Sequence, residues 1–343
     1  MTNPSLRLGL ALDFGHRSIR SRIAELLPVL RRAEESGFDS VWVGENYPQP
    51  PSELEDHVPS ALVLLSYLAP ITRLRLGTGV LLRPAWSPAR LAYDAAVLDV
   101  LSGGRLTLGI GLGSPELQRR FGFEPSSFAR VFEDTLRYLK SAWAGKEFGS
   151  SLFPTSGIVP SPSQEGGPRL LVAGSLDRSA RRAAELGDGY YAATGYGLER
   201  IRRLAGVYRS AVRRRTAAAT EVVAANRIVV IARSSTEARA VARSGAGRVL
   251  EVYRKRGVLA SYRRRSTLEG LEGVDLDAVD GYQLFDRLGD RLCLFGTAAE
   301  VADQLRAYAG AGVTDVNARV APPGVSIAAA VRTVTELQQI QQA

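Results

Sequence analysis

The chain has 343 residues, of which 45% are hydrophobic, and a formal net charge of +9. This length suffices for the core of one large α/β domain. Cys293 is the single cysteine and His16 and His57 are the only histidines, which excludes an intrachain disulfide and a metal site of several thiolates or imidazoles, so demanding chemistry would fall to an organic cofactor.

Eight apolar segments in chain order predict strands, and a stretch of helical character follows each of them. The strands begin near Leu6, Ser40, Leu74, Leu106, Arg169, Gly189, Asn226 and Thr314. Residues 169–174 and 227–232 are apolar at successive positions, which suits a parallel sheet covered on both faces. Eight such units predict a (β/α)8 TIM barrel, an α/β fold formed as a single domain by residues 1–343.

One helix-to-strand junction recurs at 33–43, 183–193 and 309–320. In each, an alanine-rich helix end meets a glycine that can adopt the left-handed conformation, and an apolar strand follows. The alternative architecture is a doubly wound open sheet. Its support is weak, because residues 109–113 are spaced G-x-G-x-G and not as the G-x-G-x-x-G dinucleotide fingerprint.

Two segments exceed ordinary loop length: residues 145–168, after the fourth strand, and residues 244–291, after the seventh. The first is rich in glycine, serine and proline, and the second is charged and contains several glycines. Long excursions of this kind in compact domains are typically functional lids or disordered segments. We expect both insertions to act as lids.

The positive charge comes almost wholly from arginine, with runs at 213–215 and 263–265. Such clusters can bind nucleic acid, but these lack interleaved aromatic residues and lie among alanines on expected solvated helix faces. No apolar run is long enough to span a bilayer, and residues 1–13 do not have the pattern of a secretion signal. We expect a cytoplasmic protein that binds neither nucleic acid nor membranes.

Polar side chains follow the first two predicted strands. In a TIM barrel the site lies at the carboxyl ends of the strands. Asp13 ends the first strand, and Glu45, Asn46 and Tyr47 follow the second, either as caps for the next helix or as the floor of a site. The third and fourth strands end in glycines, which suits the close approach of a flat ring system.

The fifth predicted strand runs directly into a helix through the sequence AGSLDRSARR. Ser175, Asp177 and Ser179 lie at the start of this helix, where free N–H groups and hydroxyls can bind an anion such as a phosphate. The alternative is that Ser175 or Asp177 serves only as the N-cap.

Four longer stretches occur in a specific order: AEESGFDSVWVGENY, TRLRLGTGVLLRPAWSPARLAYDAAVLDVLSGGRLTLGIGLGSPE, RLLVAGSLDRSARRAAELGDGYYAA and FGTAAEVADQLRAYAGAGVTDVNARV. Together they resemble the bacterial-luciferase-like flavin-dependent oxidoreductases, over about residues 6–320. The resemblance implies a barrel that binds FMN, or the deazaflavin coenzyme F420, across its strand ends. It also implies a non-proline cis peptide at Gly79–Val80 beneath the ring. The implied cofactor-binding residues are Asp13, Gly79, Val80, Gly111, Gly174, Ser175, Ser179 and Thr194, with no metal.

This chain departs from its relatives at several positions. Many relatives have a histidine in place of Asn46, and because an amide cannot transfer a proton as imidazole does, Asn46 would orient a reactant through hydrogen bonds. Luciferases have an arginine for the phosphate where Leu112 stands. Deazaflavin dehydrogenases have a glutamate near Ser114 and a lysine near Tyr196, and the absence of both favours FMN.

The resemblance implies the oxygenase of a two-component monooxygenase. A separate flavin reductase would supply reduced FMN, and O2 would be used to oxygenate a small apolar or aromatic substrate. Asn46, Glu45 and Tyr47 are the expected catalytic residues, and a homodimer is expected. One alternative is hydride transfer with coenzyme F420. A second is a flavin-binding barrel without catalysis.

Overall fold

The computed structural model describes residues 6–14, 18–45, 58–149, 157–215, 221–264 and 268–342. In these ranges the strands are β1 (Arg7–Leu12), β2 (Ser40–Val43), β3 (Arg75–Thr78), β4 (Leu81–Leu82), β5 (Leu106–Gly111), β6 (Arg169–Ala173), β7 (Gly189–Ala192), β8 (Val223–Ile231), β9 (Cys293–Gly296) and β10 (Asp315–Arg319). The helices are α1 (Ile19–Glu35), α2 (Ala61–Leu68), the 3-10 turn η1 (Arg83–Ala85), α3 (Pro88–Ser102), α4 (Pro115–Arg120), α5 (Phe128–Trp143), α6 (Asp177–Leu186), α7 (Leu198–Arg215), α8 (Ser235–Lys255), α9 (Val258–Arg264), α10 (Gly281–Leu292), α11 (Ala298–Gly310) and α12 (Ile327–Gln342).

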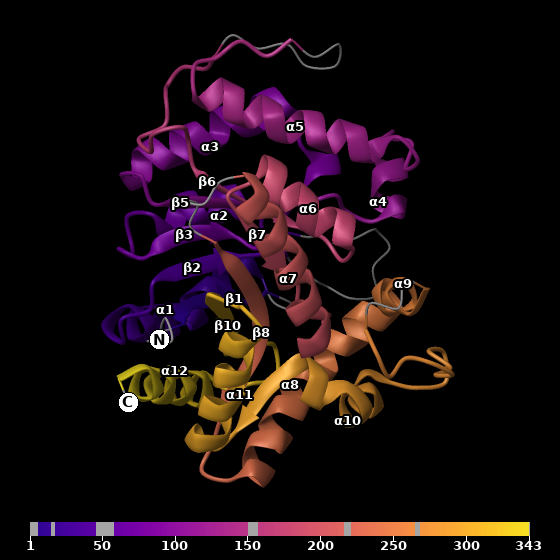
Figure 1. Ribbon diagram of the computed structural model, residues 1–343. Coiled ribbons are helices and arrows are strands. Elements are labelled where there is room, and N and C mark those ends of the chain that lie inside the picture. The colour runs from indigo at the N-terminus through magenta and orange to yellow at the C-terminus, as the bar shows by residue number, and fades with distance from the viewer. Residues whose placement is uncertain are drawn as a thin grey trace.

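The strands form one parallel sheet that closes into a barrel, with helices on its outer surface (Figure 1). The order around the barrel is β1, β2, β3, β5, β6, β7, β8 and β10, and β10 returns to pair with β1. The short strand β4 follows β3 and pairs with β5. These strands correspond to the eight predicted ones, so the TIM-barrel prediction is confirmed and the open sheet is wrong.

Strand β9 was not predicted. It pairs with the last four residues of β8, while the earlier part of β8 pairs with β10. A run of only four residues is too short for its periodicity to be told from that of a helix end.

Trp42 fills the centre of the barrel. Its indole Nε1 donates a hydrogen bond to Ser40 Oγ at 2.8 Å. The neighbouring strands carry glycine at the facing positions, and a methyl group added at Gly77 or Gly9 would lie 2.4 or 2.6 Å from the indole. Because such contacts are too close for real side chains, glycine on both sides lets one large ring occupy the interior.

The insertion at 145–168 was predicted to be a lid, and that prediction is wrong. The segment follows α5 and precedes β6, so its described residues lie at the amino ends of the strands, away from the expected site. Gln164 secures this position: its backbone N–H donates to Asp99 Oδ2 at 2.9 Å, and its Nε2 donates to the carbonyl of Leu106, the first residue of β5, at 2.7 Å. Only residues 145–149 and 157–168 of it are described.

The insertion at 244–291 is largely helical and begins inside α8. The glycines within its helices reflect close packing, whereas Gly257, Gly270 and Gly273 lie between helices with positive φ. A methyl group added at Gly247 would lie 2.4 Å from the Tyr282 ring of α10, and one added at Gly245 would lie 2.6 Å from Pro322. Helix glycines therefore allow α8 to lie directly against α10 and the segment after β10.

Arginines of the runs at 213–215 and 263–265 interact with other parts of the fold. Arg213 forms an ion pair with Glu221 at 3.1 Å, and Arg263 donates to the carbonyl of Val274 at 2.7 Å. None of the described helices combines the length and the apolar sequence needed to cross a bilayer.

Candidate active site

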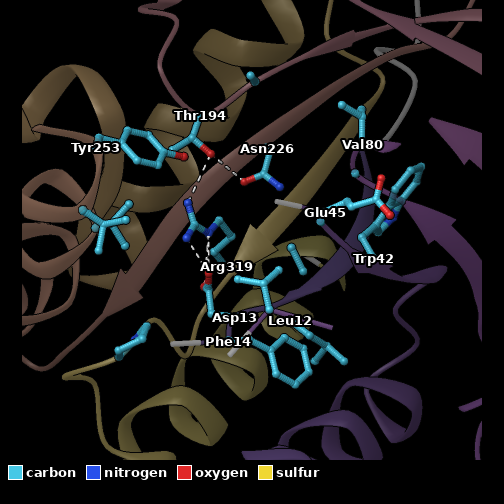
Figure 2. A pocket seen from close by; sticks show the side chains of 18 of the residues that line it. Leu12, Asp13, Phe14, Trp42, Glu45, Val80, Thr194, Asn226, Tyr253 and Arg319 are labelled. Atoms are coloured by element: carbon cyan, nitrogen blue, oxygen red, sulfur yellow. Dashed lines mark hydrogen bonds and ion pairs between the residues drawn. The ribbon is translucent and has the colours of Figure 1, made fainter. Parts of the chain in front are cut away.

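A cavity of about 250 Å³ lies at the carboxyl ends of the barrel strands (Figure 2). Its walls come from the ends of β1, β2, β3, β7 and β10, from β8, and from helix α8. The lining residues are Ala11, Leu12, Asp13, Phe14, Trp42, Gly44, Glu45, Val58, Gly79, Val80, Tyr191, Ala193, Thr194, Asn226, Arg248, Val249, Val252, Tyr253, Arg256, Arg319 and Pro323. Five predicted site residues are thus brought together: Asp13, Glu45, Gly79, Val80 and Thr194.

A buried ion pair crosses the cavity wall between β1 and β10. Arg319 Nε donates to Asp13 Oδ1 at 2.9 Å and to Oδ2 at 3.1 Å, and Nη2 also donates to Oδ1. The side chains are only 13% and 8% exposed. Burial disfavours the guanidinium charge, but the Asp13 carboxylate outweighs it and the pKa of Arg319 is raised.

A chain of hydrogen bonds continues from this pair into the barrel (Figure 2). Arg319 Nη1 lies 3.4 Å from Thr194 Oγ1, which donates to Asn226 Oδ1 at 2.8 Å. Asn226 Nδ2 donates to Tyr191 Oη at 3.1 Å. Burial raises the pKa of Tyr191, so its hydroxyl stays protonated at neutral pH. The network fixes the orientation of each polar group on the cavity floor.

Glu45 anchors the backbone on the other side of the cavity. Its Oε2 accepts hydrogen bonds from the Leu82 backbone N–H at 3.0 Å and from Trp86 Nε1 at 2.9 Å. The carboxylate therefore joins the end of β2 to the β4–η1 segment. This geometry indicates a positioning role for Glu45. Asn46 and Tyr47 lie outside the described residues.

The end of β3 has the backbone geometry expected from the resemblance. The Gly79–Val80 peptide bond is cis, which confirms the predicted position. Both residues line the cavity, and Gly111 does not. Gly111 packs against Val80 instead, because a methyl group added at Gly111 would lie 3.3 Å from a methyl carbon of Val80.

The start of α6 forms a separate cluster with Gly174, Ser175 and Ser179. None of the three lines the cavity. The N-cap position is Leu176, and no side chain caps the helix, so neither Ser175 nor Asp177 is the N-cap. Asp177 instead forms an ion pair with Arg203 at 2.9 Å. No side chain therefore caps the first N–H groups of α6. Two buried serines, Ser175 and Ser179, lie beside them, and this arrangement could accommodate a phosphate group.

Several cavity residues were missed from the sequence, among them Trp42, Tyr191, Asn226, Tyr253 and Arg319. Asn226 lies in a strand whose other residues, apart from Arg227, are apolar, and this was a usable signal because a buried amide needs partners. Arg319 gave none, since an arginine at the end of a strand is ordinarily a surface residue. Among the described residues, no group of His, Cys, Asp and Glu side chains is arranged to hold a metal ion.

Comparison with known proteins places these features in a family. The family model described as luciferase-like monooxygenase matches residues 8–315. The chain is 31% identical over 201 residues to an F420-dependent glucose-6-phosphate dehydrogenase from Kineococcus radiotolerans, which covers 56% of this chain and 59% of that protein. It is 30% identical over 172 residues to the oxygenase component of a flavin-dependent trigonelline monooxygenase from Acinetobacter baylyi, covering 48% and 46% respectively. The matches thus span between about half and three fifths of these relatives.

A solved structure shares the fold. It is the oxygenating constituent of 3,6-diketocamphane monooxygenase from the CAM plasmid of Pseudomonas putida, in complex with FMN. The TM-score is 0.76 at 20% identity, with 98% of this chain and 97% of that chain covered. At this identity the likeness concerns the fold alone.

Proposed function

The chain belongs to the luciferase-like monooxygenase family, and on that premise we propose that it is the oxygenase of a two-component system. It would take reduced FMN from a flavin reductase and use O2 to oxygenate a small apolar or aromatic substrate. Relatives in the family include flavin-dependent monooxygenases and F420-dependent oxidoreductases, so the choice of cofactor rests on this chain's own residues.

One observation carries the proposal: both described carboxylates that line the cavity are engaged by the protein itself. Asp13 is held by Arg319, and Glu45 by Leu82 and Trp86. The described walls therefore offer shielding and orientation more than acid–base chemistry. That suits a reaction in which the cofactor supplies the reactivity and the protein excludes water.

The residues present fit a flavin. The glycine backbone at Gly44 and Gly79 lets a flat ring approach the strand ends, beside the fixed polar groups of Asp13 and Thr194. The uncapped start of α6, with Ser175 and Ser179, would hold the phosphate. Reduced flavin, when bound, supplies the electrons that activate O2.

The two positions that separate FMN from F420 have other roles in this structure. Ser114 caps α4, since its Oγ accepts from the Leu117 backbone N–H at 3.1 Å. Tyr196 is buried, with its ring 6.4 Å from that of Tyr262. Neither position offers a charged side chain to a cofactor, which supports FMN. Hydride transfer with F420 is the second candidate, favoured by the F420-dependent relative.

Asn46 and Tyr47, which lie outside the described residues, remain proposed catalytic residues, whereas the hydrogen bonds of Glu45 support a positioning role for it. Glu45 would hold the end of β2 in place, and Asn46 and Tyr47 would orient the substrate through hydrogen bonds.

Reduced FMN should bind at least about tenfold more tightly than reduced F420 in an anaerobic titration, a difference of about 1.4 kcal/mol. Ser179→Ala should weaken reduced FMN binding several-fold but leave reduced riboflavin unchanged, since riboflavin has no phosphate. On admission of O2, bound FMN should be reoxidised more slowly than free FMN because the cavity excludes water.

Three outcomes would contradict parts of this proposal. Tight binding of F420 with no binding of reduced FMN would favour hydride transfer. Binding of FMN with an unaltered rate of reoxidation would favour the barrel without catalysis. Equal effects of Ser179→Ala on FMN and riboflavin would place the phosphate elsewhere.

We also propose a homodimer, supported by an exposed apolar surface on two adjoining helices, α2 and α3. The exposed side chains are Val63, Tyr67, Tyr93, Val100 and Leu101, and Leu101 is 68% exposed. Apolar surface of this kind typically marks a protein contact. Light scattering should give about twice the chain mass of 36.9 kDa, and Leu101→Glu should halve it. A wild-type protein that is monomeric at micromolar concentration would contradict the dimer.

A further inference from the structure

Helix α8 forms one wall of the cavity. Arg248, Val249, Val252, Tyr253 and Arg256 all line it. Residues four apart lie on one face of a helix, so Arg248 and Val252 face the cavity together on successive turns, and Arg256 follows directly after the helix. The wall therefore combines an apolar strip with guanidinium groups.

Arg248 differs from the other arginines of α8. Arg239 pairs with Asp290, Arg243 with Asp286 and Arg254 with Glu251. Arg248 is exposed, and no carboxylate of the described residues lies within 4.0 Å of its guanidinium. Of the four arginines of α8, only Arg248 lines the cavity, and it has no acidic partner among the described residues.

The carboxylates of the cavity are committed elsewhere. The Asp13 carboxylate accepts hydrogen bonds from Arg319, and Tyr253 interacts electrostatically with the same guanidinium. The Glu45 carboxylate accepts hydrogen bonds from the Leu82 backbone N–H and from Trp86 Nε1. Figure 2 shows Glu45 and Tyr253 on opposite sides of the cavity, so the acidic Glu45 is remote from the α8 wall. A ligand that enters beside α8 meets positive charge that the protein has not neutralised.

We propose that the substrate carries an acidic group, a carboxylate or a similar oxyanion, which Arg248 binds. This inference rests on the proposed function, because it takes the ligand beside α8 to be the molecule that is oxygenated. The fork of N–H donors on a guanidinium matches the two oxygens of a carboxylate. The apolar part of the substrate packs against Val249 and Val252, with Phe14 on the β1 side.

The same anionic chemistry could come from the phosphate of FMN. The uncapped start of α6 lies outside the cavity and suits that phosphate, which leaves Arg248 for the substrate. A binding experiment separates the two sources, since riboflavin and FMN differ only in the phosphate.

The test compares benzoate with benzamide, which have nearly the same shape and differ in charge. Binding is measured by calorimetry on the full chain, with and without FMN. The wild-type protein should bind benzoate about tenfold more tightly at low salt, and the preference should fall as ionic strength rises. Arg248→Gln should abolish the preference, and Arg248→Lys should retain part of it.

Arg233→Gln is the matched control. Arg233 is also exposed and precedes α8, about 20 Å along the helix from Arg248 at 1.5 Å per residue. Arg233→Gln removes the same charge as Arg248→Gln and should leave the preference for benzoate over benzamide intact. Binding of reduced FMN should be unchanged in both glutamine variants, whereas a loss of FMN affinity in Arg248→Gln would assign this arginine to the phosphate and overturn the inference.

Other results would also overturn it. Equal binding of benzoate and benzamide to the wild type, or no binding of either, would exclude an acid site at α8. A benzoate preference that survives in Arg248→Gln would place the anion site elsewhere. If reduced FMN binds and is reoxidised by O2 more slowly than free FMN, while no benzoate preference appears, this inference alone fails. If FMN does not bind at all, the proposed function fails first.

Discussion

Replacing Arg319 with glutamine should lower the free energy of unfolding by about 3–5 kcal/mol. The change strands the Asp13 carboxylate, whose side chain is 8% exposed, without the cation that pairs with it. An uncompensated buried charge is more costly than the loss of the pair's attraction. Urea denaturation at neutral pH measures the effect, and the double variant Asp13→Asn with Arg319→Gln should recover much of the loss.

The same two strands contain a matched control. At the opposite ends of these strands, Arg7 donates to Asp315 through Nε and Nη2, each at 2.7 Å. Here β1 contributes the arginine and β10 the aspartate, the reverse of the cavity pair. The Arg7 side chain is 41% exposed. Because water screens that pair, Arg7→Gln should cost about 1 kcal/mol or less. If Arg319→Gln costs no more than Arg7→Gln, burial is not what makes the cavity pair important.

Replacing Arg227 with methionine should lower the free energy of unfolding by about 3–5 kcal/mol and also weaken binding of reduced FMN. Arg227 is fully buried, and its partners are backbone carbonyls and one phenol. Nη1 donates to the carbonyls of Ala193, Thr194 and Asn226 at 3.1, 3.2 and 2.7 Å. Nη2 donates to the carbonyl of Tyr196, and Nε donates to Tyr308 Oη at 2.6 Å.

The reason for two effects is that Arg227 holds the segment after β7 in place. Without its donors, several buried carbonyls lose their hydrogen bonds. The segment includes Thr194, which lines the cavity, so its displacement should reduce the affinity for reduced FMN about tenfold. Denaturation and anaerobic titration measure the two effects separately.

Arg227→Lys should restore part of the stability, since an ammonium still supplies three donors. Arg233→Met, on the surface, should change neither property. A stability loss in Arg227→Met with an unchanged FMN affinity would show that the segment after β7 does not position the cofactor.

The eight strands of the barrel could be predicted because their signal is local. Each is an apolar run followed by a helical stretch, and glycine marks several of the junctions, as at Gly37, whose φ is 76°. The polar residues Asp13 and Glu45 could be selected because parallel strands end at one face of a barrel. Both line the cavity, together with Gly79, Val80 and Thr194.

A local pattern can have two structural meanings. Glycines in 244–291 suggest a long excursion, but Gly245 and Gly247 lie in a helix where packing against Pro322 and Tyr282 excludes a larger side chain. Whether this segment acts as a lid stays a prediction. The insertion at 145–168 has a lid-like composition, but composition does not say at which end of the barrel a loop lies. Its place between a helix and the next strand decides that.

The sequence by itself determined the fold class, the order of the strands and the end of the barrel that bears the cavity, because these follow from periodicity over a few residues and from the rules of parallel β/α connection. Only the tertiary structure decided what surrounds each polar group. Asp13 and Arg319 are 306 residues apart and meet when β10 closes the barrel against β1. Arg248 reaches the cavity only because α8 folds back over the strand ends. Burial and charge pairing depend on such distant contacts, and a short window of sequence does not contain them.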